Sequence, residues 1–305
     1  MSDARHAFLA HLIDDAALFP PASLPLGEAV AEHRLAAAGP HSWMQGRFLC
    51  PASRLPDLAA ALDGDAGGWT IGAVLDGPAR GGAWVEAVRA DLDVVASFAE
   101  HAAVDLVEVP LPAGDPGAAV AGMADALAAA GLGAVLPCLE VPFGGQWDEQ
   151  VPAVVAMIGD VGASAKIRCG GPSPGDFPAP GQLARFVAAC RDAEVSFKAT
   201  AGLHHPVRRP DPVTGATMHG FLNLGAAAVA ACARGATEER LTEILEETDP
   251  AAFRLDETGC GWREHIADGA EVAAVREALF LSYGSCSFSE PVVDLVALGV
   301  LTASR

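Results

Sequence analysis

Short apolar segments alternate with longer amphipathic segments along most of the chain. The apolar segments end in Gly, Pro, Ser or Asp, and the alanine-rich stretches between them place apolar residues at helical spacing. This alternation is typical of a parallel sheet built from β–α units, in which a helix returns the chain to the start of the next strand. Eight segments have the pattern of strands: 11–17, 46–52, 69–77, 104–111, 133–141, 164–171, 195–202 and 219–225.

Eight such units fit the usual size of a (β/α)8 barrel of the TIM type. An open, doubly wound sheet is the competing architecture, but neither GxGxxG nor GxxxxGK[ST] follows the first strands, so the usual nucleotide fingerprints are absent. We therefore predict an α/β fold with a barrel catalytic domain over residues 1–235. Residues 236–305 begin with the acidic helix TEERLTEILEETDP and are expected to form a C-terminal helical extension packed on the barrel.

Composition and charge narrow the classes of partner. Apolar residues make up 51% of the 305-residue chain, while the formal net charge is −20, which disfavours binding to a phosphate backbone. No apolar run reaches membrane-spanning length, and the N-terminus lacks a signal-peptide pattern. The seven cysteines are scattered without CxxC spacing, as in proteins of a reducing compartment. We expect a cytoplasmic protein that binds neither nucleic acid nor membranes, and, by analogy with other barrels, a homodimer.

Lysine occurs only at positions 166 and 198, inside the predicted strands AKIRCGG and FKATAG. A glycine follows each lysine at the carboxyl end of its strand, where barrel active sites assemble. Alternation along the strands places Arg168 on the face of Lys166 and Thr200 on the face of Lys198.

If both faces point inward, two ammonium groups about 5 Å apart repel by roughly 3 kcal/mol. Such repulsion predicts that Lys198 lowers the pKa of Lys166 enough to supply the neutral amine that attacks a carbonyl group. The alternative interpretation is that the two lysines are inward residues that extend their ammonium groups toward water, or ion-pair partners of Glu108 and Glu140.

The order of the motifs resembles that of the class I aldolase superfamily, most of all deoxyribose-phosphate aldolase. The likeness spans residues 11–225 and lies in LIDDAALFPPAS, FLCPAS, IGAVLDGP, VDLVEVPL, AKIRCGG and FKATAGL. It implies that Lys166 forms a Schiff base, that Lys198 perturbs its pKa, and that Asp105 relays protons. The family's phosphate-binding loops are not matched, so we expect a small, non-phosphorylated carbonyl or hydroxy-acid substrate. The whole chain also resembles a family of bacterial proteins that share FPPA, FKATAGLHHP and GSCSF, a likeness that implies no activity.

Three histidines follow the second lysine strand, and they support two hypotheses. In one, His204, His205 and His219 are ligands of zinc or a similar ion in a metal-dependent hydrolase or lyase. In the other, they bind substrate, with His204 or His219 as a proton shuttle. The alternative is a histidine of a capped loop without a chemical role, and for His205 the adjacent Pro206 favours such a turn position. A third hypothesis is a ligand-binding barrel without catalytic activity.

The leading hypothesis is a Schiff-base aldolase or lyase that needs no metal and no cofactor. In it Arg168 orients a carboxylate or hydroxyl group of the substrate. The predicted catalytic residues are Lys166, Lys198, Asp105 and His204, and the predicted substrate-binding residues are Arg168, Asp15, Thr200, His219 and Asn223.

Overall fold

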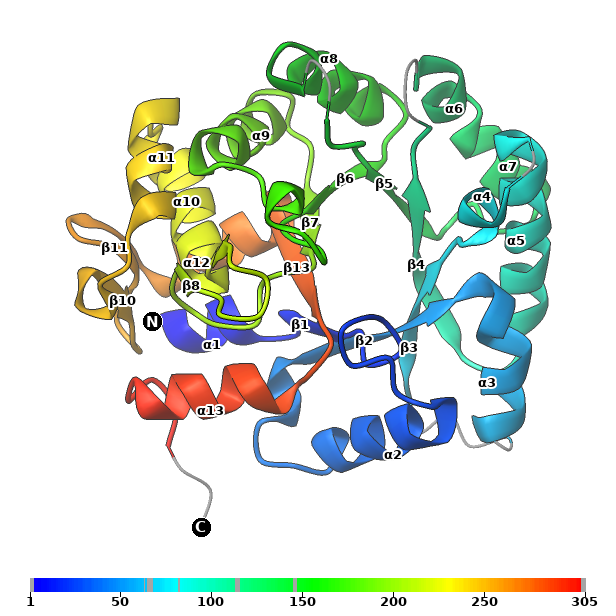
Figure 1. Cartoon of the computed structure of the whole chain (residues 1–305), viewed down its shortest axis with the longest axis horizontal. Helices are drawn as coiled ribbons and strands as arrows, with labels where there is room; N and C mark the ends of the chain where they lie inside the picture. Colours follow the sequence, from blue (N-terminus) through cyan, green and yellow to red (C-terminus); the bar gives the residue numbers. More distant parts are fainter. Residues whose placement is uncertain are drawn as a thin grey trace.

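The computed structural model of the chain describes residues 3–62, 64, 68–81, 83–112, 116–144 and 147–302. At its centre eight parallel strands form a closed barrel with helices around it (Figure 1). This confirms the predicted TIM-type barrel. The barrel strands are β1 (Ile13–Asp15), β2 (Gln45–Pro51), β3 (Thr70–Val74), β4 (Ala103–Pro110), β5 (Leu136–Glu140), β6 (Ser164–Arg168), β7 (Phe197–Thr200) and β13 (Phe280–Ser285).

The helices cover the outside of the barrel, because the outward side chains of the strands are apolar and need a buried environment. Among the helices of the described residues, none is both long and apolar enough to cross a membrane. The helices are α1 (Ala4–Leu9), α2 (Leu26–Ala37), α3 (Leu55–Leu62), α4 (Gly77–Arg80), α5 (Trp84–Phe98), α6 (Gly117–Ala121), α7 (Met123–Ala129), α8 (Trp147–Asp160), α9 (Pro180–Asp192), α10 (Phe221–Arg234), α11 (Glu238–Glu246), α12 (Gly269–Ala278) and α13 (Ser289–Ala297).

The eighth barrel strand is not the predicted segment 219–225, whose residues from Phe221 onward begin helix α10. Instead β13 closes the barrel between β7 and β1. Between β7 and β13 the chain forms α10, α11, α12 and a small antiparallel sheet. This sheet contains β10 (Phe253–Leu255), β11 (Cys260–Trp262) and β12 (His265–Ala267).

The prediction failed here because most of α10 is buried and it therefore lacks a polar face with helical spacing. A short apolar run from such a helix cannot be distinguished from a buried strand by its pattern alone. The barrel consequently extends into residues 236–305, the region expected to be an appendage.

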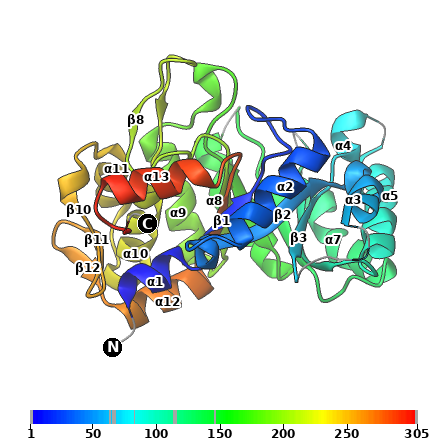
Figure 2. The same ribbon diagram turned by 90° about the horizontal axis from the view of Figure 1, so that it is seen from below.

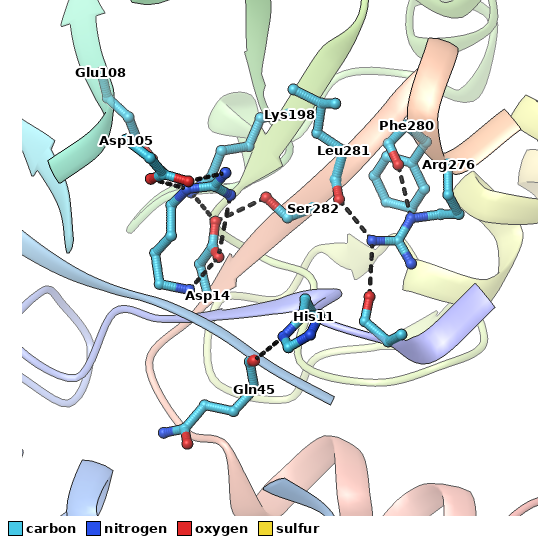
Figure 3. Close-up of polar contacts among 12 residues, drawn as sticks. His11, Asp14, Gln45, Asp105, Glu108, Lys198, Arg276, Phe280, Leu281 and Ser282 are labelled. Carbon is cyan, nitrogen blue, oxygen red and sulfur yellow. Dashed lines mark hydrogen bonds and ion pairs between the residues drawn. The ribbon is translucent and has the colours of Figure 1, made fainter. Parts of the chain in front are cut away.

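Arg276 of α12 joins the start of β13 to the start of β1 (Figure 3). Its guanidinium donates to the backbone oxygens of Phe280 at 2.8 Å, Leu281 at 2.7 Å and Ala10 at 3.2 Å, and also to that of Phe8. Burial lowers the pKa of Arg276 to about 10, since neutral carbonyl groups replace its water. The contacts tie the last barrel strand to the first at their N-terminal ends.

The loops at the opposite, C-terminal end of the barrel pack tightly against each other. Figure 2 shows β8 (Arg209–Pro210), which pairs with β9 (Thr217–Met218), projecting beyond one end of the barrel, while α1 and α12 lie toward the other end. A Cβ on Gly202 would lie 2.9 Å from the oxygen of Cys169 and 3.1 Å from the Cα of Gly170, and φ at Gly202 is +67°. The glycines that follow the two lysine strands are therefore required by the close approach of two backbones.

Because α1 packs closely against α10, we expect one added methyl group between them to destabilise the fold. A Cβ at Gly225 would lie 2.2 Å from two ring atoms of the buried Phe8, so Gly225→Ala should lower the free energy of unfolding by about 1–3 kcal/mol. Gly27→Ala in α2 is the matched control. No atom lies within 4 Å of a Cβ there, so the free energy should stay unchanged or rise by up to about 1 kcal/mol. Denaturant unfolding measures both values, and equal stability of the two variants would contradict this packing.

Candidate active site

Four acidic and four basic side chains form one connected network of ion pairs inside the barrel and at its rims. Their formal charges sum to zero. The acidic members are Asp14 on β1, Asp105 and Glu108 on β4, and Glu140 on β5, and the basic members are Arg47 on β2, Lys166 and Arg168 on β6, and Lys198 on β7.

Lys198 lies at the centre of the network and is fully buried. Its Nζ contacts Asp14 Oδ2 and, at 2.6 Å, Glu108 Oε1 (Figure 3). Ser282 Oγ on β13 donates a hydrogen bond of 2.7 Å to the same Asp14 Oδ2. The register of β7 and β13 pairs Lys198 with Ser282, so closure of the barrel by β13 brings these groups together.

Lys166 lies on the adjacent strand, in register with Lys198. Its Nζ is 2.6 Å from Glu108 Oε2 and 2.7 Å from Glu140 Oε2. Glu108 therefore uses one oxygen for each lysine and bridges the two ammonium groups.

The surrounding carboxylates favour the protonated form of both lysines. Burial alone would lower the pKa of Lys166 and of Lys198, but the ion pairs with their carboxylates outweigh it, and the pKa of each is raised above 10.5. Although burial acts to raise the pKa of Glu108, the two lysines lower it from 4.5 to about 2. The pKa of Glu140 is also lowered, by Lys166 and Arg168 against the effect of burial.

The prediction that Lys198 makes Lys166 neutral is therefore wrong. It counted the repulsion between the two ammonium groups and left out the carboxylates that project into the same space. The alternative interpretation, in which the lysines pair with Glu108 and Glu140, is confirmed by the contacts of both lysines.

The network reaches the C-terminal mouth of the barrel at Glu140 and Arg168. The side chain of Arg168 is 48% exposed and that of Glu140 18%, whereas that of Lys166 is 5% exposed. Arg168 Nε donates to Glu140 Oε1 over 3.3 Å, and Thr200 is the register partner of Arg168 on β7. Arg168 and Thr200 thus lie beside the lysines as predicted, with Lys166 just below the mouth.

Asp105 lies toward the start of β4, away from the mouth. Its carboxylate receives two hydrogen bonds from Arg47, of 2.6 and 2.8 Å, and its side chain is 45% exposed. In the described part of the chain it has no contact with Lys166. The structure therefore does not support Asp105 as the proton relay for that lysine.

Asp15, a predicted substrate-binding residue, points out of the barrel. Its Oδ2 lies 2.8 Å from His33 Nδ1 on α2, and its Oδ1 accepts a hydrogen bond from the amide of Ala17. The neighbouring Asp14 supplies the inward carboxylate instead, because successive side chains of a strand alternate between the two faces. The sequence gives no signal for which of the two adjacent aspartates points inward.

The histidines do not form the predicted cluster. His204 Nδ1 lies 3.2 Å from Glu290 Oε2 and 3.8 Å from the Sγ of Cys286, while His205 Nδ1 lies 2.6 Å from Asp294 Oδ2. Both histidines thus connect the loop after β7 to α13 rather than to the lysines.

His219 and Asn223 are buried parts of the scaffold beneath the same loop. His219 Nε2 lies 2.7 Å from the backbone oxygen of Pro178, and its Nδ1 lies 3.1 Å from Arg208 Nη1. A neutral ring protonated at Nε2 satisfies both contacts, and burial lowers the pKa of His219 to about 4. Asn223 accepts from the amide of Arg208 and donates to the backbone oxygen of Ile244. The predicted substrate-binding role of both residues is not supported.

Because the three histidines have separate partners, the structure gives no support to them as one ligand set. Over the described ranges, no group of three or more His, Cys, Asp and Glu side chains is arranged to hold a metal ion.

No protein-family model and no curated protein matches the chain. Among solved structures it is similar to the carboxyl transferase domain of Rhizobium etli pyruvate carboxylase, determined with 3-hydroxypyruvate. The sequence identity is 12% and the TM-score is 0.47, over 90% of this chain and 48% of that one, so the chain spans about half the length of its neighbour. At this level the likeness adds nothing to the barrel fold that the strand order establishes.

The closed charge network predicts strong energetic coupling between Lys198 and Asp14. Lys198→Met leaves an uncompensated negative charge in the barrel and should lower the free energy of unfolding by about 3–5 kcal/mol. Adding Asp14→Asn to that variant removes the excess charge and should restore part of the loss, whereas Asp14→Asn in the unmodified chain should destabilise. Denaturant unfolding of all four proteins tests this cycle, and additive effects would contradict the coupling.

Proposed function

We propose that the chain is a barrel enzyme that joins Lys166 to a small carbonyl compound as a Schiff base and makes or breaks a carbon–carbon bond in it. One observation carries the proposal: Lys166 lies just below the mouth, in direct contact with two carboxylates, of which Glu140 is partly exposed. A lysine beside a proton acceptor at the carboxyl ends of barrel strands has what carbonyl attack requires.

Glu140 is the proton acceptor and donor in this mechanism. A proton moves from the Lys166 ammonium to Glu140, and the neutral amine attacks the carbonyl carbon. A second proton passes from the nitrogen to the former carbonyl oxygen, which gives a carbinolamine. Protonated Glu140 then gives a proton to the carbinolamine hydroxyl group, which leaves as water. The amine is left as a protonated imine, two ammonium protons depart in the water, and Glu140 is again ionised.

Charge balance supports an imine at this position. A protonated imine carries the same single positive charge as the ammonium group that it replaces, so Glu108 and Glu140 keep their counter-ion after the adduct forms. Leaving a buried charge unpaired is costly, and the imine leaves no charge of the network unpaired. The network therefore tolerates the covalent intermediate.

Glu108 and Lys198 are positioning residues in this account. Glu108 contacts both lysines and, as their shared counter-ion, stays ionised while Glu140 exchanges protons. Lys198 holds Glu108 from below through a contact of 2.6 Å and never faces the substrate, because it is fully buried.

A non-catalytic barrel in which the network only stabilises the fold is the second candidate. The pairing of both lysines with carboxylates favours it, since a fold by itself confers no chemistry. The two candidates differ in whether Lys166 ever becomes a nucleophile.

Borohydride trapping tests the proposal, because hydride reduces an imine to a stable secondary amine. With a panel of small aldehydes and oxo acids we expect a mass increase on the peptide that contains Lys166. Lys166→Arg should abolish the adduct, since a guanidinium stays protonated and cannot attack a carbonyl group. Glu140→Gln should slow adduct formation roughly 100-fold or more, as expected for loss of a general acid–base group.

The two lysines serve as controls for each other, because the chain has no other lysine side chain. An adduct only on the peptide containing Lys198 would reverse the assigned roles. A folded protein that gives no adduct with any compound would favour the non-catalytic barrel.

A further inference from the structure

We infer that the substrate is an anionic carbonyl compound of the 2-oxo acid class, and that the Arg168 guanidinium binds its carboxylate. The inference rests on the proposed function and adds the chemical class of the substrate. Arg168 is a cation at the mouth of the barrel, and its side chain is 48% exposed.

Most of the hydrogen-bonding capacity of Arg168 is unused. Within the described ranges its one polar side-chain contact is from Nε to Glu140 Oε1, at 3.3 Å, and both terminal nitrogens have no partner there. A planar guanidinium with two such nitrogens can donate two parallel hydrogen bonds to the two oxygens of one carboxylate. Thr200, the register partner of Arg168, adds a hydroxyl group on the same inner face.

Lys166 and Arg168 are close enough to share one carboxylate group, which suits a small oxo acid. Glu140 contacts Lys166 Nζ at 2.7 Å through one oxygen and Arg168 Nε at 3.3 Å through the other, so the two cations flank a single carboxylate group. In a 2-oxo acid the carbonyl carbon is bonded directly to the carboxylate carbon. A carboxylate held by Arg168 therefore brings an adjacent carbonyl carbon within the short range that separates Arg168 from Lys166.

Electrostatics also favours a local anion site at this place. The chain has a net charge of −20, so an anion needs a specific cation to approach. A substrate carboxylate on Arg168 places a second negative charge beside Glu140. Because like charges repel, this second charge increases the proton affinity of the Glu140 carboxylate. An uncharged aldehyde brings no such second negative charge to the mouth of the barrel.

The test compares borohydride trapping of matched compounds at subsaturating concentration. Pyruvate and glyoxylate are the anionic probes, and hydroxyacetone and glycolaldehyde are their uncharged counterparts of similar size. The ratio of the anionic to the uncharged trapping rate should fall by about 10- to 100-fold in Arg168→Gln, the loss expected for a charge-assisted hydrogen-bonded pair. Arg168→Lys should keep part of the ratio, because it retains the charge but loses the planar pair of nitrogens.

Arg240→Gln is the control, since it removes one positive charge from α11 in the outer layer and should leave the ratio unchanged. Comparing ratios between proteins cancels the intrinsic reactivity of each compound. An unchanged ratio in Arg168→Gln, with adducts still on Lys166, would overturn the oxo acid assignment and leave the proposed function standing. Absence of adducts with all four compounds would overturn both.

Discussion

The sharing of the Glu108 carboxylate between two buried lysines is the interaction on which the rest of the barrel interior depends. Each ion in this space costs several kcal/mol to remove from water, and only close partners offset that cost. Glu108 supplies one oxygen to Lys166 and the other to Lys198, so neither ammonium group is left with a single counter-ion. Lys166 is therefore a protonated, fully paired group at rest, and it becomes reactive only when a nearby carboxylate accepts its proton.

The topology of the fold creates this arrangement. Asp14, Glu108 and Lys198 lie on the first, fourth and seventh strands in the sequence, and only a closed barrel brings them within contact distance. Closure depends on β13, which enters after an insertion of helices and a small sheet and supplies Ser282 to the network. Arg276, far from the mouth, donates hydrogen bonds to the backbone oxygens of Phe280 and Leu281 at the start of that strand.

The sequence was sufficient to predict the barrel and its lysine strands, because apolar runs and interior lysines are local signals. The eighth strand was not predictable by the same route, since Phe221–Arg234 is buried enough to lack the polar face that identifies a helix. The lysine pair was predicted correctly, but its protonation state was not, because that depends on carboxylates from distant strands. Asp14 and Asp15 show the same limit: adjacent identical residues point to opposite faces, and only the folded structure distinguishes them.

The protonation state of the two lysines is the central claim, and the composition of the chain allows it to be measured directly. Since lysine occurs only twice, protein labelled with ¹⁵N-lysine gives two Nζ signals in an NMR spectrum, which substitution of either lysine assigns. We expect both nitrogens to remain ammonium groups from neutral pH to beyond 10.5, the ordinary pKa of lysine. A neutral amine on either lysine at pH 7, or a titration well below that ordinary pKa, would contradict it.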